Sequence, residues 1–363
     1  MENKKRLLFA VGGTGGHLFP AQALARQIHA LDPSIEILFV GSKLSTNLYF
    51  LRQEFTFQEI ASSSLSKNPI KLFNALKALA KGTAQSYALL KEFSPDLVVG
   101  FGSFHAFPTL FAASVMHASF MLFEPNLHAG KVNKIFSKRS ILNSLQFSET
   151  AKEMKGVWKS VKMPLWSASV ENKSYTQAEA KAFYGLKSDE QTLLIFGGSQ
   201  GAAWINEWMA CFSLSSHCQV IHLAGNDKEC INLEQQYKKR KIHAAVKPFE
   251  QNMHLAWTAA DLAICRAGAS TLAELITYEK PALLIPYPYA HGHQKRNGEF
   301  FQETVRGGFY LEQAEINEQN FADRLKRLQE QKELFKSNIQ SFKQNEKKED
   351  FAELILNFLE NKR

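Results

Sequence analysis

The sequence has little of what marks small secreted or metal-binding domains. Its 363 residues include four cysteines, none in a C-x-x-C pair (Cys211, Cys218, Cys230 and Cys265). This spacing argues against a disulfide framework and a zinc site, and it favours a reducing compartment. The N-terminal apolar run is only "LLFAV" before glycines begin. Because a secretory signal needs a longer run, we expect none.

The longest stretch without a charged residue runs from Leu97 to Phe123, which is long enough to raise the question of a membrane span. Its glycines, its proline and its two histidines argue against a span. The stretch instead predicts a buried strand, a glycine loop, a helix opened by Pro108 and a second strand.

Acidic residues are outnumbered, with 35 Asp and Glu against 43 Lys and Arg, which gives a net charge of +8 and a pI near 9.1. Such a field favours acidic partners, namely phosphate-bearing ligands, anionic lipid or nucleic acid. The length and a hydrophobic content of 45% indicate a globular protein of about two domains.

Short apolar runs alternate with amphipathic helical stretches in both halves of the chain, which predicts an α/β fold with parallel sheets. Each half opens with a strand, a glycine loop and a helix, so we expect two Rossmann-like domains facing one another across a cleft. The predicted strands are 6–11, 36–41, 96–102, 119–124, 192–198, 218–225, 244–249, 261–265 and 281–288.

The two glycine loops read "GGTGGH" at 12–17 and "GGSQGA" at 197–202. Such loops let ligand oxygens approach backbone N–H groups at a positive helix end, although glycines also serve merely to form tight turns. Neither loop matches G-x-G-x-x-G, and "EILFVGS" ends without the acidic residue that grips an NAD ribose. A dinucleotide site is therefore disfavoured.

Two further segments carry candidate ligand contacts. In "CRAGASTLAE", small residues open a helix and Glu274 can reach a pair of sugar hydroxyls, but Thr271 and Glu274 equally fit a capping box. In "HGHQKRN", His291 and His293 lack the acidic or cysteine partner that a metal site needs. Gln294 suits sugar hydroxyls because its amide both donates and accepts, and its alternative is a solvated loop side chain.

A set of motifs occurs in an order and spacing that resemble the MurG family of bacterial cell-wall transferases, within glycosyltransferase family 28. The motifs are "GGTGGHLFPA", Glu124-Pro125-Asn126, "GGSQGA", "CRAGASTLAE" and "HQ-x-x-N", and the likeness covers about residues 6–310. It implies inverting transfer of GlcNAc from UDP-GlcNAc to undecaprenyl-diphosphate-linked MurNAc-pentapeptide, the lipid I to lipid II step of peptidoglycan synthesis. Epimerisation of UDP-GlcNAc, or nucleotide-sugar binding without catalysis, remains the alternative.

The resemblance also implies the domain roles. A GT-B fold would place the acceptor on residues 1–162 and UDP-GlcNAc on residues 163–344, with a helix at about 345–363 packing back on the first domain. It implies no cofactor, no metal and no nucleic acid. It implies peripheral attachment to an anionic membrane surface, at the cytoplasmic face of the inner membrane.

By the same resemblance, the site residues divide by the part of the ligand they meet. The GlcNAc side would be lined by Thr14, Gly15, Gly16 and Asn126. The donor phosphates would meet Ser199, Gln200 and Gly201 and the helix start at Ala269, Ser270 and Thr271. Glu274 would hold the ribose, and Gln294 would read the GlcNAc hydroxyls.

His17 is the candidate base that deprotonates the acceptor hydroxyl, because histidine is the side-chain type whose ordinary pKa lies near neutrality. It would alternatively bind the acceptor's diphosphate or cap the following helix, and Glu124 is the second candidate base. The chain departs from the family pattern where Phe123 replaces a histidine, where Trp166 replaces an arginine, and where Phe104 and His105 enter a glycine-rich acceptor loop.

The stretch 71–91 predicts an amphipathic helix. Its apolar stripe (Leu72, Leu76, Leu79, Tyr87 and Leu90) lies opposite Lys77 and Lys81. The stripe predicts either packing on the domain's own core or contact with anionic lipid.

Overall fold

The computed structural model describes residues 4–13, 15–166, 175–198, 201–214, 218–290 and 292–361. The chain divides into two compact units, which we call unit 1 (residues 1–169 and 347–363) and unit 2 (residues 170–346). Each unit contains one parallel β-sheet, which confirms the predicted α/β class with two Rossmann-like sheets.

The sheet of unit 1 is parallel throughout, with strand order β3-β2-β1-β4-β5-β6-β7. The strands are β1 (Arg6–Ala10), β2 (Glu36–Gly41), β3 (Phe57–Glu59), β4 (Leu97–Gly100), β5 (Phe120–Glu124), β6 (Leu142–Leu145) and β7 (Trp158–Ser160). The residues of β1, β4 and β5 are almost all apolar and buried, as expected for strands that are covered on both faces.

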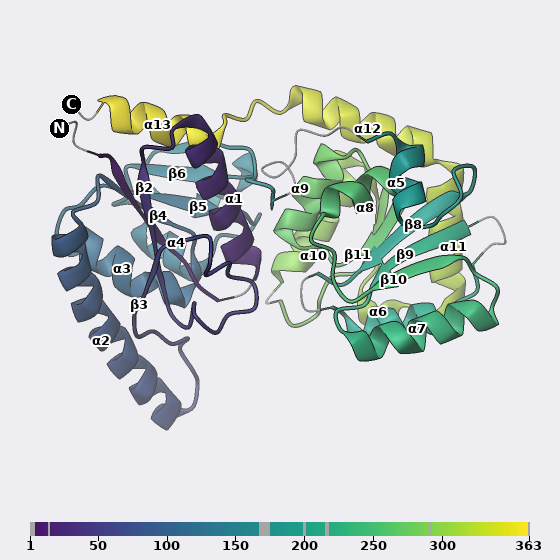
Figure 1. Ribbon diagram of the computed structural model, residues 1–363, viewed down its shortest axis with the longest axis horizontal. Coiled ribbons are helices and arrows are strands. Elements are labelled where there is room, and N and C mark those ends of the chain that lie inside the picture. Colours follow the sequence, from purple (N-terminus) through teal and green to yellow (C-terminus); the bar gives the residue numbers. More distant parts are fainter. Residues whose placement is uncertain are drawn as a thin grey trace. The chain divides into compact units, whose positions relative to one another are not determined.

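Helices cover both faces of this sheet (Figure 1). One face carries α1 (Gly15–Leu31) and α13 (Phe351–Asn361), and the other carries α2 (Pro69–Phe93), α3 (Ser103–Val115) and α4 (Lys131–Phe136). Asn68 caps α2 by accepting from the N–H groups of Ile70 and Lys71, and Ser94 ends it in a left-handed conformation.

Helix α3 begins at Ser103, so the expectation that Pro108 opens it is wrong. Gly102 at φ 81° turns the chain out of β4 directly into the helix, and Pro108 lies inside α3 among buried neighbours. Within the described residues, no helix combines the length and apolar character needed to cross a membrane.

The face that α2 buries differs from the predicted stripe. Leu79 and Leu90 are buried, but Leu76 is 52% exposed and Tyr87 40% exposed. The middle of the buried face of α2 requires a small residue. A Cβ on Gly82 would stand only 1.8 Å from the carbonyl oxygen of Ala61. The chain of α2 therefore packs too closely at Gly82 for a larger side chain. Packing on the core holds for Leu79 and Leu90 and does not hold for Leu76 and Tyr87.

The sheet of unit 2 has strand order β10-β9-β8-β11-β12-β13. Its strands are β8 (Gln191–Phe196), β9 (Cys218–Leu223), β10 (Ala244–Lys247), β11 (Leu262–Cys265), β12 (Ala282–Leu284) and β13 (Gly308–Tyr310). Its helices are α5 (Gln177–Phe183), α6 (Ala203–Cys211), α7 (Asp227–Lys239), α8 (Met253–Ala259), α9 (Ala269–Thr277), α10 (His293–Phe300), α11 (Glu318–Glu330) and α12 (Lys332–Asn345), with a π-helix at Phe301–Val305.

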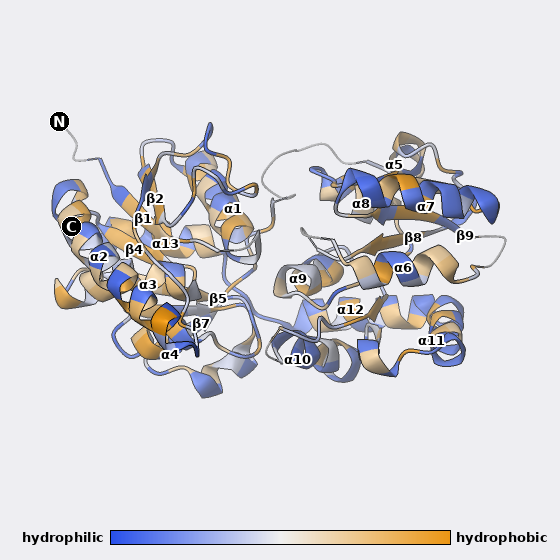
Figure 2. Ribbon diagram, turned by 90° about the horizontal axis from the view of Figure 1, so that it is seen from below, coloured by the Kyte–Doolittle hydropathy of each residue, from blue (hydrophilic) through white to orange (hydrophobic). Residues whose placement is uncertain are grey.

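Residues of α6 and α11 share one core cluster with β8 and β11, including Ile205, Met209, Phe321 and Leu325. Helix α5 packs on α8. Helix α7 is largely hydrophilic, as a surface helix should be (Figure 2), and only Cys230, Leu233 and Tyr237 of it are buried.

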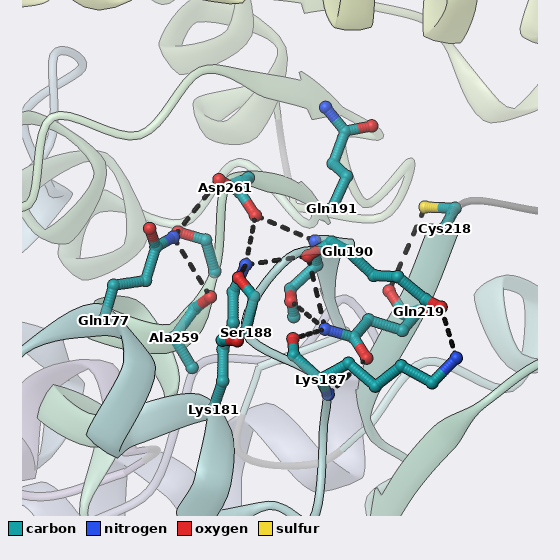
Figure 3. A network of polar contacts seen from close by, with 12 residues as sticks. Gln177, Lys181, Lys187, Ser188, Glu190, Gln191, Cys218, Gln219, Ala259 and Asp261 are labelled. Carbon is teal, nitrogen blue, oxygen red and sulfur yellow. Dashed lines mark hydrogen bonds and ion pairs between the residues drawn. The ribbon is translucent and has the colours of Figure 1, made fainter.

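A polar network ties the amino ends of the unit 2 strands to α5 (Figure 3). The Nζ atom of Lys181 lies 3.2 Å from Oδ2 of Asp261, and their side chains are 4% and 15% exposed. The same ammonium donates to the carbonyl of Glu190 at 2.7 Å, and the N–H of Thr192 donates to Asp261. Opposite charges and backbone carbonyls thus compensate a lysine that is almost fully buried.

The C-terminal part of the chain forms two helices, α12 and α13. Helix α12 ends at Asn345, and α13 begins at Phe351 and packs on α1. Phe351 stacks on Phe123 at 5.4 Å between ring centroids. Glu349 exchanges backbone hydrogen bonds with Ser160 and Lys162, so the returning segment runs beside the end of β7.

Candidate functional site

The loops that follow β1 and β4 meet in unit 1 at the point where the strand order reverses. Strands β1 and β4 are neighbours, and their crossovers lead in opposite directions along the sheet. Ligands of open α/β sheets bind outside the carboxyl ends of the strands at such points. The sequence "GGTGGH" and the segment from Phe101 to His105 therefore come together.

Gly12 and Gly13 have φ values of 143° and 89°, which favour glycine. A Cβ on Gly12 would stand 2.6 Å from the Cβ of His105, so the close approach of α3 also demands glycine. Asn47 donates its amide to the carbonyl oxygen of Gly13 at 3.0 Å and fixes the loop from the other side. Thr14 lies outside the described residues.

His17 lies in the first turn of α1, immediately after Gly15 and Gly16. Its side chain is partly buried, and its Cδ2 lies 3.7 Å from the point that a Cβ on Gly102 would occupy. The first turns of α1 and α3 both lie in this region. Backbone N–H groups at helix N-termini favour the binding of anions.

Glu124 ends β5, next to β4, and is 2% exposed. Its Oε1 accepts from the backbone N–H and the side-chain amide of Asn126, both at 3.1 Å. Its Oε2 accepts from the N–H of Gly130 at 2.8 Å and from Nδ2 of Asn133 at 2.9 Å. Burial raises the pKa of Glu124, while these donors act in the opposite direction.

Asn133 is a site residue that the sequence did not suggest. It is 1% exposed, and its Nδ2 donates to the carbonyl of Phe123 as well as to Glu124. Among the described residues its Oδ1 has no hydrogen-bond partner, and it lies 3.7 Å from the point that a Cβ on Gly102 would occupy. Its only signal in the sequence is an asparagine that follows Val132 in a short helix.

Unit 2 repeats the arrangement, with β8 and β11 as the neighbouring strands where the order reverses. Gly201 has a φ of 70°, and a Cβ there would stand 2.7 Å from the carbonyl oxygen of Ala224. Ser199 and Gln200 lie outside the described residues. The start of α9 at Ala269, Ser270 and Thr271 follows β11 and so lies at the same edge of the sheet.

The capping-box alternative for Thr271 and Glu274 is wrong. Gly268, in an extended conformation, is the N-cap of α9, and it has no side chain with which to cap the helix. Thr271 is therefore inside the helix, and Glu274 is one turn further on.

The carboxyl group of Glu274 lies in a poorly solvated place although the residue keeps some exposure. Burial raises its pKa to about 7, and the indole N–H of Trp257 offsets part of this shift without forming a hydrogen bond of standard geometry. Trp257 is itself fully buried against Phe196 and Tyr278. Ligand hydroxyls that donate to this carboxyl group would stabilise its ionised form, which burial makes costly.

Gln294 lies in the first turn of α10 rather than in a loop. Its Oε1 accepts from the N–H of Tyr287 at 2.9 Å, which leaves the amide NH₂ available to donate to a ligand. Asn297, one turn later, is fully buried and donates to the carbonyl of Ala267 at 2.9 Å. This hydrogen bond links α10, which carries Gln294, to the loop that precedes α9. It could not be predicted from the sequence.

Trp166, which stands where the family pattern has arginine, packs on α1. The guanidinium of Arg26 lies 3.6 Å from the centroid of its ring, and the ring of Phe19 lies at 6.5 Å. Arg26 also forms a two-pronged ion pair with Glu54. Across the described ranges, no group of three or more His, Cys, Asp or Glu side chains is placed to hold a metal ion.

Two family models match the chain: the glycosyltransferase family 28 N-terminal domain over residues 7–140, and the family's C-terminal domain over residues 192–355. The chain belongs to glycosyltransferase family 28. This confirms the resemblance on which the site predictions rest.

Family 28 relatives match over most of their length. One from Protochlamydia amoebophila (strain UWE25) is 42% identical over 312 residues, covering 85% of this chain and 83% of the relative. Another from Carboxydothermus hydrogenoformans is 35% identical, covering 82% and 81%. Both are described as UDP-N-acetylglucosamine–N-acetylmuramyl-(pentapeptide) pyrophosphoryl-undecaprenol N-acetylglucosamine transferases.

Among solved structures, a crystal structure of Acinetobacter baumannii MurG is similar to this chain with a TM-score of 0.73 at 22% identity, covering 98% of this chain and 99% of that one. At 22% identity this similarity supports the fold alone. The inference about activity rests on the relatives at 42% and 35% identity.

Proposed function

We propose that this chain is an inverting glycosyltransferase of peptidoglycan synthesis, which transfers GlcNAc from UDP-GlcNAc to undecaprenyl-diphosphate-linked MurNAc-pentapeptide. The observation that carries the proposal is the 42% identity, over most of both chains, to a relative described by that activity. Glycine loops and helix starts at the switch points of both sheets suit two substrates that each contain a diphosphate.

We assign the donor to unit 2. The loop of Ser199, Gln200 and Gly201 and the start of α9 would bind the diphosphate of UDP-GlcNAc. Glu274 would accept hydrogen bonds from the ribose hydroxyls, and the free amide of Gln294 would donate to the sugar. Asn297 supports this arrangement because it holds the loop at Ala267 against α10.

We assign the acceptor to unit 1, at the loops that follow β1, β4 and β5. Gly15, Gly16 and Asn126, with Thr14, would meet the transferred sugar, as the family likeness implies. The uncommitted Oδ1 of Asn133 supports this assignment, since a buried carbonyl oxygen gains from a ligand hydroxyl that donates to it.

Transfer requires that the acceptor hydroxyl lose its proton as its oxygen bonds to the anomeric carbon, while the bond from that carbon to the diphosphate breaks and UDP leaves. We propose His17 as the base that takes this proton. Glu124 suits the role less well, because both of its oxygens already accept two hydrogen bonds and it is 2% exposed. Its contacts instead hold Asn126 and Asn133 in place.

We further propose that α2 attaches the protein to the cytoplasmic face of the inner membrane, where a lipid-linked acceptor would be found. Ile70, Phe73 and Leu76 are 72%, 58% and 52% exposed, and lysines lie among them at 67, 71 and 77. The Nζ of Lys77 lies 4.6 Å from the ring of Phe73, so apolar and cationic groups share one surface. Such a surface suits anionic lipid.

Co-sedimentation with vesicles tests this attachment. The variant Ile70→Ser/Phe73→Ser/Leu76→Ser should lose binding to anionic vesicles, and wild-type binding should weaken with salt and with neutral lipid. Leu334→Ser in unit 2, where the leucine is 57% exposed, is the matched control. Binding that ignores lipid charge, salt and the three serines would contradict the attachment.

Incubation of the pure protein with UDP-GlcNAc and a soluble lipid-linked acceptor analogue tests the function. The expected product is the GlcNAc-MurNAc disaccharide on the acceptor, with one UDP released for each. Formation of UDP-ManNAc would identify an epimerase, and binding of UDP-GlcNAc without any product would identify a non-catalytic subunit. Either result would refute the transferase.

A further inference from the structure

A serine and a histidine form a close pair beside the acceptor loop of unit 1. Oγ of Ser62, in the segment after β3, lies 2.6 Å from Nδ1 of His105 in the first turn of α3. The backbone N–H of His105 is in turn 3.4 Å from the hydroxyl of Ser103. The contact with Ser62 thus holds Nδ1 of His105, a residue in the first turn of the 13-residue helix α3.

The other edge of this imidazole faces the glycine loop. A Cβ on Gly13 would stand 3.6 Å from Cδ2 of His105, 3.3 Å from Oγ of Ser103 and 3.9 Å from Nδ1 of His17. Side chains from the first turns of α1 and α3 therefore surround the backbone of Gly13. Because Cδ2 is bonded to Nε2, the edge of the ring opposite Ser62 is the one that lies at the loop.

The pair suits a neutral imidazole, and the Ser62 hydroxyl can either donate to Nδ1 or accept from it. Burial, followed by the charge of Lys43, lowers the pKa of His105. A neutral imidazole carries one N–H, and the nitrogen that bears it is set by the hydrogen bond at the other nitrogen. When the Ser62 hydroxyl donates to Nδ1, the proton is on Nε2, at the edge facing Gly13.

We propose that His105 is a further binding residue for the acceptor: its Nε2–H donates to an oxygen of the acceptor's diphosphate over Gly12 and Gly13, and Ser62 is the positioning residue that sets its tautomer. The inference rests on the proposed function, from which it takes the acceptor. A hydrogen bond to an anionic oxygen is stronger than one between neutral groups. The N-termini of α1 and α3 add to the attraction for the same anion.

Amide substitutions separate the two nitrogens of His105. The amide of Asn reaches about as far as Nδ1, whereas that of Gln reaches about as far as Nε2. His105→Asn should therefore keep the contact with Ser62 but raise the KM for a soluble diphosphate-containing acceptor analogue about 10- to 100-fold, the effect of a lost hydrogen bond to a charged group. His105→Gln should stay within about threefold of wild type, because it restores a donor at the loop.

The readouts are the two KM values, kcat and thermal unfolding. In His105→Asn, kcat and the KM for UDP-GlcNAc should change by less than about twofold, because the lost bond serves acceptor binding alone. Ser62→Ala should raise the acceptor KM about three- to tenfold, and it carries the test if His105→Asn does not fold. The control is His117→Asn, since His117 is exposed beyond the far end of α3 with φ 56°, which asparagine tolerates.

An unchanged acceptor KM in His105→Asn, or an equal loss in the Asn and Gln variants, would overturn the inference while wild type still transfers GlcNAc. A fall in kcat at unchanged acceptor KM would also overturn it. If the wild-type protein itself fails to transfer GlcNAc, the proposed function has failed, which is a different result.

Discussion

Replacing Glu274 by Gln should make the ligand-free protein more stable above neutral pH while weakening its binding of UDP-GlcNAc. Burial raises the pKa of Glu274 from 4.5 to about 7. Between these two values the folded protein keeps a proton that the unfolded chain has released, so the stability contributed by this group falls as pH rises. Glutamine keeps the shape of the side chain and avoids the cost of the buried charge.

The size of the effect follows from the shift in pKa and from the exposure of the residue. A fully buried group with this shift would lose roughly 3 kcal/mol between pH 4.5 and 7. Because Glu274 keeps some contact with solvent, we expect Glu274→Gln to gain about 1 to 2 kcal/mol at pH 8 and almost nothing at pH 5. Urea unfolding at the two pH values measures this difference.

Binding should change in the opposite direction. Glu274→Gln loses an anionic acceptor for the ribose hydroxyls, so its affinity for UDP-GlcNAc should fall about 10-fold or more at pH 8. Wild-type affinity should increase from pH 6 to 8, and that of the variant should stay level. UDP-GlcNAc is the probe because the terminal phosphate of UDP itself titrates at about pH 6.

Glu207→Gln is the control for both measurements, since Glu207 is an exposed residue of α6. A Glu274→Gln protein that is less stable at both pH values and binds UDP-GlcNAc like wild type would refute the reasoning. Glu274 would then be a structural residue of α9.

Three further perturbations test other parts of the structure. Lys181→Met should lower the free energy of unfolding by about 3 to 5 kcal/mol, because it leaves the carboxylate of Asp261 without its buried partner, and a loss below about 1 kcal/mol in urea unfolding would contradict this. Glu153, bound by Lys134 and His128, has its pKa lowered from 4.5 to about 2, so its contribution is present above pH 4.5 and is lost as pH falls toward 2. Glu153→Gln should accordingly destabilise the protein by about 1 to 3 kcal/mol at pH 7, and the difference from wild type should shrink between pH 5 and pH 3; a difference that does not depend on pH would contradict the assignment. His17→Ala should lower kcat by roughly two to four orders of magnitude, leave UDP-GlcNAc binding nearly unchanged and remove the acidic limb of the pH–rate profile; an unchanged kcat with a much higher acceptor KM would make His17 a binding residue.

The sheets were predictable because their central strands are buried on both faces. Each of the nine predicted runs overlaps a strand of the structure. For the central strands the reason is that a strand covered on both faces must be almost wholly apolar. The strands that the sequence did not reveal, β3, β6, β7 and β13, are three or four residues long. Asn143 and Ser144 in β6 are fully buried although they are polar, and the amide of Asn143 donates to the carbonyl of Ser137 at 3.1 Å. Neither residue is of a type that predicts a core position.

Side-chain contacts across the sequence were harder to predict. For the stripe on α2, the core-packing alternative fails at Leu76 and Tyr87, because the close approach of Gly82 to Ala61 sets the buried face and leaves no mark in the apolar pattern. The Thr271 capping box failed because Gly268 begins α9 earlier. Asn133, Asn297 and the Ser62–His105 pair depend on contacts between distant segments, and only the fold brings those segments together.

The configuration of the new glycosidic bond tests the central claim most directly. NMR of the anomeric proton, recorded while the pure protein turns over UDP-GlcNAc and the acceptor analogue, reports both the transfer and its stereochemistry. We predict one disaccharide for each UDP released, with the configuration at the transferred anomeric carbon inverted. A retained configuration, or release of free GlcNAc with no disaccharide, would contradict an inverting transferase.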